Sequence, residues 1–157
     1  MKTVYLDHNS TTPLHPKVLE AILPYFKEGY EAVIGSRDVK GAKMSPPQRF
    51  YKRWLGDFGN LFIQSLLLPG IWDTQCGFKC FSDEATEKIF HLTKINGWGF
   101  DPEALVLAKA LGYKIKEMPV FWVNDPHTHV RLLSYLQVLW EVVKVRWWLW
   151  RNSYGIK

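Results

Sequence analysis

The amino-acid sequence predicts a mixed α/β fold. Short apolar or alternating runs, typical of strands, lie between longer stretches in which apolar residues recur at helical spacing. The chain has 157 residues, of which 47% are hydrophobic and 22% are charged. This is enough for one compact domain with a hydrophobic core, and it argues against wholesale disorder.

The first part of the chain predicts two helices around one strand. Apolar residues recur at helical spacing over 18–26, and Pro24 is expected to kink or end that helix. Residues 32–34 are an apolar run bounded by glycine, which is typical of a buried strand. A loop rich in Lys, Gly, Ser and Pro is expected over 36–48, and a helix over 48–68.

The middle of the chain predicts a strand followed by two helices. Residues 77–81 alternate as a strand does, and Ser82 is a suitable N-cap for the helix that follows. Asp101 is predicted to cap the next helix, with Pro102 at its first position and Gly112 past its end.

The C-terminal part predicts an edge strand and an aromatic helix. Residues 114–123 should lie near a sheet edge, because Pro119 cannot donate a backbone hydrogen bond. Residues 130–150 have an amphipathic pattern and contain four of the eight tryptophans, but charges interrupt the apolar run, which disfavours a simple transmembrane span. Neighbouring Trp and Arg suit a membrane headgroup zone. This pattern fits both an interfacial membrane helix and a helix that packs on protein.

Charge and cysteine content bear on partners and compartment. The net charge of +5 suits an anionic partner, such as a sugar nucleotide, a lipid phosphate or a membrane, although it also serves solubility. Cys76 and Cys80 lack a second pair at zinc-ligand spacing, so reduced thiols and no metal site are expected. No cleavable signal peptide is visible, which predicts a cytoplasmic location or the cytoplasmic face of a membrane. No nucleic-acid partner is expected.

Four motifs follow one another in a fixed order. They are VIGSR at 33–37, DTQCGFK at 73–79, GFDPE at 99–103 and PVFW at 119–122. In this order they resemble the C-terminal half of family 2 glycosyltransferases that transfer a hexose to a polyprenyl (dolichyl-type) phosphate, over about residues 29–150. The resemblance implies a partial GT-A-like (Rossmann-like) domain, to which the residue patterns add an amphipathic C-terminal helix and a short N-terminal helical arm. It also implies a nucleotide sugar and a polyprenyl phosphate as partners.

Basic residues after the first motif predict an acceptor-phosphate site. Arg37 follows a strand end, where α/β sheets present ligand groups, and arginine forks match phosphate oxygens. In the resembled family, the Gly-Ser-Arg loop and a later arginine contact the acceptor phosphate. Arg37 matches the first position, and either Arg49 or Arg53 matches the second. Without the motif order, the same cluster would be interpreted as a solvated basic loop.

The second motif predicts the sugar side of the site. The resemblance places Asp73 and the turn at Cys76, Gly77 and Phe78 beside the donor sugar. Glycine in this turn would permit a close backbone approach. A purely structural alternative is a turn aspartate and a glycine that adopts positive φ.

The third motif supplies further catalytic candidates beside Asp73. Asp101 and Glu103 align with the family's Phe-Asp-x-Glu, and relatives that act on hydroxyl acceptors use a carboxylate near here as general base. A phosphate acceptor is already ionised, so Asp101 would only orient loops or the sugar. A structural role as a helix N-terminus is compatible with this.

The donor half of such an enzyme has no counterpart in this sequence. Family 2 transferases are expected to hold Mg²⁺ or Mn²⁺ at an Asp-x-Asp motif, and no Asp-x-Asp occurs in the chain. A truncated enzyme that is weak or inactive alone is therefore expected, with a separate N-terminal half as a candidate partner.

The N-terminal segment carries a different resemblance. VYLDHNSTTP at 4–13 resembles the start of a cysteine desulfurase of the class V aminotransferase family, without that family's cofactor motifs downstream. This predicts a chimeric chain with an arm over 1–28, a half-domain over 29–126 and an amphipathic helix over 127–157. The alternative functions are a non-catalytic membrane-associated or interaction fragment, and a pyridoxal-phosphate-dependent desulfurase remnant.

Overall fold

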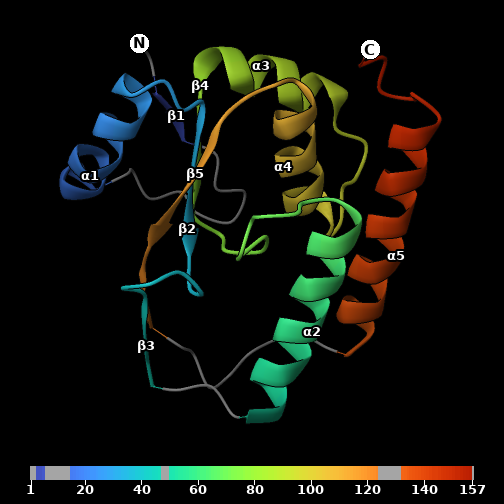
Figure 1. Cartoon of the computed structure of the whole chain (residues 1–157), viewed down its shortest axis with the longest axis horizontal. Helices are drawn as coiled ribbons and strands as arrows, with labels where there is room; N and C mark the ends of the chain where they lie inside the picture. The colour runs from blue at the N-terminus through green and yellow to red at the C-terminus, as the bar shows by residue number, and fades with distance from the viewer. Residues whose placement is uncertain (1–2, 6–14, 47–49, 124–131, 157) are drawn as a thin grey trace.

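The computed structural model describes residues 3–5, 15–46, 50–123 and 132–156 (Figure 1). Its strands are β1 (Thr3–Tyr5), β2 (Ala32–Ser36), β3 (Lys43–Ser45), β4 (Lys79–Ser82), β5 (Ile115–Pro119) and β6 (Phe121–Val123). Its helices are α1 (Pro16–Lys27), α2 (Phe50–Leu66), α3 (Asp83–Leu92), α4 (Phe100–Ala110) and α5 (Leu132–Trp150). The mixed α/β architecture confirms the predicted fold class and is consistent with a partial Rossmann-like glycosyltransferase domain.

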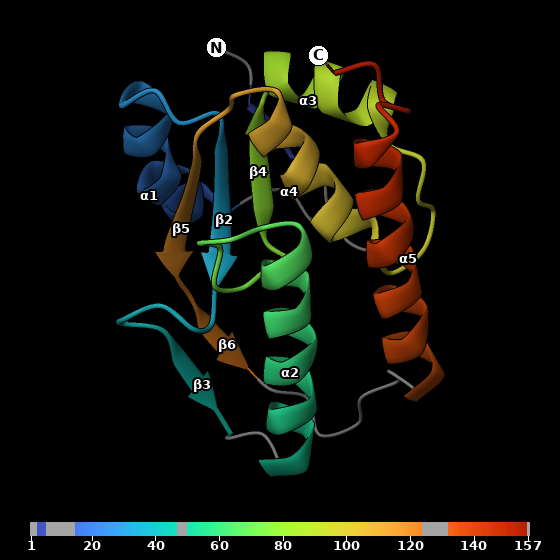
Figure 2. The ribbon, with the colours of Figure 1, turned by 45° about the vertical axis from the view of Figure 1, so that its right-hand side comes forward.

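A four-stranded mixed sheet in the order β1-β4-β2-β5 forms the centre of the structure (Figure 2). Strands β2 and β5 run parallel, with Ala32 opposite Ile115 and Ser36 opposite Pro119. Strand β4 is antiparallel to both of its neighbours. Strand β5 lies at the edge of this sheet, which confirms the position that Pro119 predicts.

The strand predicted over 114–123 is divided in two. Strand β5 ends at Pro119, and the chain then passes into β6, which pairs in parallel with β3 in a separate two-stranded sheet. Strand β3 lies within 36–48, where only a loop is predicted. At Val120, between the two strands, the backbone N–H donates to the Ser36 carbonyl at 3.2 Å and the carbonyl accepts from Lys43 N at 3.0 Å. These two bonds join the small sheet to the end of β2.

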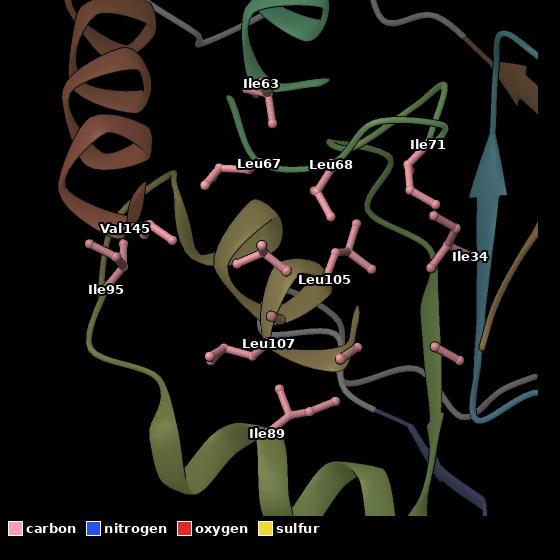
Figure 3. Close-up of a cluster of buried hydrophobic side chains, with 14 of the residues drawn as sticks. Ile34, Ile63, Leu67, Leu68, Ile71, Ile89, Ile95, Leu105, Leu107 and Val145 are labelled. Carbon is pink, nitrogen blue, oxygen red and sulfur yellow. The ribbon is translucent and has the colours of Figure 1, made fainter. Parts of the chain in front are cut away.

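The helices cover the two faces of the central sheet unequally. Helix α1 packs on one face, where Ile22 and Phe26 contact a cluster with Val33 and Cys80. The other face is covered by the remaining helices, and Ile34 points into the larger core that they share (Figures 2 and 3). Figure 3 shows side chains from α2, α3, α4 and α5 meeting in this core, among them Ile63, Ile89, Leu105 and Val145.

Two predicted helix ends are confirmed. The Ser82 hydroxyl accepts from Ala85 N at 3.3 Å and caps α3. Gly112 follows α4 with a φ of +83°, a conformation that glycine adopts without strain.

The structure differs from two other expectations about helix ends. Pro24 does not end α1, because it lies in the last turn and the helix runs on to Lys27, with the Pro24 carbonyl accepting from Glu28 N at 2.9 Å. Helix α4 begins at Phe100 with Gly99 as its N-cap, so Asp101 lies inside the first turn and does not cap it. Glu141 of α5 accepts from the backbone N–H of Gly99, the N-cap residue itself, at 2.6 Å and so ties α5 to the start of α4.

Helix α5 is confirmed as a helix over the predicted C-terminal segment. One face packs on the core through Val138, Val142 and Val145, all of them buried. The opposite face carries large apolar residues that remain exposed, so the helix is less amphipathic than its pattern suggests. Among the described residues, no helix is both long enough and apolar enough to cross a membrane.

Candidate active site

Arg37 and Asp73 form a forked ion pair at the end of β2. The Nε and Nη2 groups of Arg37 donate to the two carboxylate oxygens of Asp73 at 2.7 and 2.9 Å. The backbone N–H of Arg37 donates to the same carboxylate at 3.0 Å. The Asp73 side chain is 2% exposed, and that of Arg37 is 25% exposed. The pair therefore joins the first and second motifs, and its fork leaves Nη1 of Arg37 outside the pair.

Both members of the pair are charged at neutral pH. Burial acts to raise the pKa of the Asp73 carboxyl, but the hydrogen bonds and charge of Arg37 outweigh it and hold the pKa below its usual value. Burial acts to lower the pKa of Arg37, and Asp73 more than compensates, so that pKa lies above its usual value. Arg37 also lies over the Trp122 ring, 5.4 Å from its centroid, which brings the fourth motif to the same place.

The loop that carries Asp73 is held from two further elements. Glu117 of β5 accepts from the backbone N–H groups of Trp72 and Asp73 at 3.0 Å. Asn60 of α2 donates to the Trp72 carbonyl and accepts from the Thr74 hydroxyl at 2.8 Å. These contacts fix the loop between the sheet and α2, so Arg37 is held in a defined orientation.

A cleft of about 340 Å³ opens beside this pair. It is lined by Arg37, Asp38, Ala42, Met44, Arg53, Gly56, Asp57, Asn60, Asp73, Gln75 and Tyr135. Its charges are mixed, and burial together with the nearby Asp73 raises the pKa of the Asp38 carboxyl. Gln75 lies within the second motif. Asn60 and Tyr135 lie outside all four motifs, and the sequence patterns do not single them out because isolated polar residues have no diagnostic spacing.

Of the two arginines considered for the second phosphate position, only Arg53 can be placed. It lines the cleft, is 67% exposed at its side chain, and lies 3.9 Å from Asp57 in a loose ion pair. An exposed pair of this kind contributes little to stability, so the guanidinium can exchange Asp57 for a ligand. Arg49 lies outside the described residues.

Two motif glycines have opposite surroundings. A Cβ on Gly35 would lie 2.7 Å from Val120 Cγ1 and 3.0 Å from Cys76 Sγ, so glycine is required for packing at that position. A Cβ on Gly77 would meet nothing within 4 Å, and Gly77 is not among the positive-φ glycines. The structural alternative for Gly77, a need for positive φ, is therefore wrong. The turn at Cys76, Gly77 and Phe78 leaves open space at its glycine.

Cys76 and Cys80 are both buried thiols. Burial raises the pKa of each, for Cys80 to about 11, so both stay protonated at neutral pH. This fits the prediction of reduced cysteines and gives neither thiol the character of a nucleophile.

Lys79 links the second motif to the third. Its side chain is 5% exposed and its Nζ lies 3.0 Å from Asp101 Oδ1, while Asp101 is 36% exposed. The same ammonium group donates to the Cys76 carbonyl. Asp101 is thus held beside the Cys76 turn but is not among the residues lining the cleft.

Glu103 is directed into the interior, away from the cleft. It is fully buried and accepts from Ile95 N at 2.9 Å, from Lys94 N at 2.9 Å and from the Tyr154 hydroxyl at 2.7 Å. Burial and the hydrogen bond to Glu103 raise the pKa of Tyr154 well above its usual value. Glu103 therefore ties α4 to the preceding loop and to the segment after α5.

The described residues do not fit the divalent metal expected for the resembled family. Nowhere in the described part of the chain do three or more His, Cys, Asp or Glu side chains gather as a metal site. Asp73, the most buried carboxylate of the cleft, is already engaged by Arg37.

No family model matches this chain. Among known proteins, it is 34% identical over 114 residues to "Dolichyl-phosphate beta-glucosyltransferase ALG5A" of Trichomonas vaginalis, which covers 72% of this chain and 34% of that protein. It is 35% identical over 106 residues to the human dolichyl-phosphate beta-glucosyltransferase, covering 66% of this chain and 33% of the relative. It is 30% identical over 152 residues to glycosyltransferase AglD of Haloferax volcanii, covering 92% of this chain and 23% of that protein.

These similarities show that the chain is related to glycosyltransferases, and they support the predicted kinship with family 2. The chain spans about a third or less of the length of these relatives. The cysteine desulfurase resemblance of residues 1–28 receives no support. The AglD match covers 92% of this chain, so the residues that it leaves out are fewer than those of the segment 1–28. The match therefore includes part of that segment.

Proposed function

We propose that this chain provides the acceptor side of a transferase that moves a hexose from a nucleotide sugar to a polyprenyl phosphate. The observation that carries this proposal is the fork between Arg37 and Asp73 at the cleft. Asp73 holds the guanidinium by one edge, which leaves Nη1 for a phosphate oxygen. The relatives named as dolichyl-phosphate glucosyltransferases support this choice of acceptor.

The proposed reaction places simple demands on the protein. An oxygen of the acceptor phosphate attacks the anomeric carbon of the sugar, a new carbon–oxygen bond forms, and the bond to the nucleotide diphosphate breaks. The acceptor is already an anion, so no general base has to remove a proton. The protein must hold the acceptor phosphate in line and neutralise its charge.

The residues divide between binding and positioning in this proposal. Arg37 and Arg53 bind the acceptor phosphate, with Arg49 as a further candidate. Asp73 orients Arg37 rather than touching the reacting atoms. Asp101, held by Lys79, and the turn at Cys76, Gly77 and Phe78 would border the sugar. Glu103, a catalytic candidate by resemblance, has a structural role here, because its hydrogen bonds all lead into the interior.

The donor side would have to come from outside this sequence. No Asp-x-Asp occurs in it, and the described carboxylates do not gather as a metal site. We therefore derive no step through a metal and expect little transfer by this chain alone. A separate chain with the donor half would complete the site.

The direct test uses titration calorimetry to measure the binding of a short, water-soluble polyprenyl phosphate such as citronellyl phosphate. We expect Arg53→Gln to weaken binding about tenfold, because a hydrogen bond to a charged group contributes on the order of 1.5 kcal/mol. Lys88→Gln removes the same charge from an exposed position on α3 and is the matched control. Equal affinities of the two variants would refute the phosphate site.

A non-catalytic role as a membrane-associated or interaction fragment is the second candidate. The observation that favours it is the exposed apolar face of α5. Calorimetry separates the two functions, since a purely structural fragment would not bind the phosphate probe.

A further inference from the structure

Helix α5 carries a continuous apolar stripe on its solvent side. Large apolar residues recur there at alternating spacings of three and four, and each is at least 41% exposed. The α5 stripe consists of Leu133, Leu136, Trp140, Val143, Trp147 and Trp150. Alternating spacings of three and four place residues on a single face of a helix, so the stripe runs along the whole helix.

The stripe residues do not belong to the core cluster that holds α5 to the protein. The buried residues Val138, Val142 and Val145 are offset from it by half a turn and contact the core. Figures 1 and 2 both place α5 at the outer side of the molecule, opposite α1. A contiguous exposed apolar surface of this kind marks an interaction site.

The charges beside the stripe are all basic. Lys144 lies 5.7 Å from the Trp140 ring centroid, and Arg151, just past the helix, lies 5.0 Å from that of Trp147. Arg146 is exposed on the other flank. The one acidic residue of α5, Glu141, is buried and faces Gly99. The surface thus combines exposed indole rings with positive charge.

This charge pattern selects among the candidate occupants. Two copies of the stripe packed on each other would bring basic flanks together with no acidic residue of α5 to offset them, which disfavours a dimer through this face. Indole rings and basic side chains are instead the combination that suits the headgroup region of an anionic bilayer.

We propose that the α5 stripe docks this chain on an anionic membrane surface, with α5 lying in the plane of the interface. The tryptophans enter the boundary between headgroups and acyl chains, and Lys144, Arg146 and Arg151 meet the lipid phosphates. The inference does not depend on the sugar-transfer function, because the stripe lies on the solvent face of α5 and needs neither donor nor acceptor.

The test is flotation of the full chain with vesicles of phosphatidylcholine, alone or mixed with phosphatidylserine. We expect the chain to float with the mixed vesicles and the tryptophan emission to shift to shorter wavelength. Changing Trp140, Trp147 and Trp150 to Ala should abolish both effects while leaving the thermal unfolding midpoint unchanged, because these side chains are exposed.

Two matched changes make the test specific. Trp54→Ala removes a 70% exposed tryptophan from α2. Trp54 lies on the opposite side of that helix from Gly56, Gly59 and Ile63, which face α5, so flotation should persist. Changing Lys144, Arg146 and Arg151 together to Gln should weaken binding to the mixed vesicles about a hundredfold, since each basic residue near such a surface contributes about fivefold.

Three outcomes would overturn the proposal. The first is no flotation of the parent chain with the mixed vesicles. The second is a loss with Trp54→Ala as large as the loss with the stripe variant. The third is a dimer, seen by light scattering, that the stripe variant abolishes, because the face would then bind a second copy.

Discussion

Asp73 is almost fully buried and accepts three hydrogen bonds from Arg37. Its replacement by Asn would leave a largely buried guanidinium without its counter-charge. We expect Asp73→Asn to lower the free energy of unfolding by about 3 kcal/mol, the order found when one partner of a buried ion pair is removed. Urea unfolding at pH 7 measures this difference.

The matched control is Asp57→Asn in the exposed pair with Arg53. That pair is 3.9 Å apart and more than half exposed on both sides, so its loss should change the unfolding free energy by less than about 1 kcal/mol. Similar losses in the two variants would mean that burial does not set the strength of the Arg37–Asp73 pair.

The same carboxylate predicts a pH dependence of stability. Because the pKa of Asp73 is lowered in the folded state, its contribution is fully present above the unfolded pKa of about 3.9 and is lost as pH falls through the folded value. The difference in unfolding free energy between the parent chain and Asp73→Asn should therefore shrink between about pH 5 and pH 3. A difference that stays constant over this range would contradict the lowered pKa.

At the residue scale, the motifs contain Arg37, Asp73 and Glu103 but do not predict the contacts that these side chains make. Arg37 and Asp73 belong to motifs of 33–37 and 73–79, but their pairing depends on a contact across 36 positions that no local pattern encodes. Tyr135 enters the cleft for the same reason, since it comes from α5. Glu103 has the right place in its motif, yet its surroundings make it a buried acceptor.

At the element scale, the contact between α5 and the start of α4 leaves no room for a side chain at Gly99. A Cβ there would lie 2.7 Å from Glu141 Cβ and 2.9 Å from its Oε2. Because Glu141 Cβ is close to the backbone, α5 itself would have to shift. We expect Gly99→Ala to cost about 1–3 kcal/mol in unfolding free energy, as overpacking does.

Gly77→Ala is the control for this prediction. A Cβ at Gly77 meets nothing within 4 Å, so the free energy of unfolding should stay within about 0.5 kcal/mol of the parent chain. Thermal unfolding compares the stability of Gly99→Ala and Gly77→Ala. Equal stability of the two variants would contradict the packing argument.

The helix ends show where local signals suffice and where they fail. Ser82 caps α3 with its own hydroxyl, so four consecutive residues contain the whole signal. At the start of α4, Glu141 accepts from the N–H of the N-cap Gly99, which lies 42 residues away in the sequence, and no local pattern encodes that contact. The division of 114–123 into two strands likewise depends on Ser36 and Lys43, which pair with Val120 from far along the chain.

At the scale of the whole molecule, the cleft brings together segments that lie far apart in the sequence. Its lining comes from β3, α2 and α5 and from the loops after β2 and α2. The predicted division at residue 28 stays a prediction, although β1 pairs with β4 and α1 packs on β2 within the same sheet.

This chain is not expected to bind a nucleotide sugar by itself. Titration of the chain with UDP-glucose and Mn²⁺ should give no heat of binding, because no Asp-x-Asp occurs in the sequence and the described carboxylates do not gather to hold a metal. Citronellyl phosphate, titrated into the same preparation, is the positive control for a folded cleft. Adding a second chain that carries an Asp-x-Asp donor half should restore nucleotide-sugar binding. Saturable binding of UDP-glucose to this chain alone would instead place a donor site among its own residues.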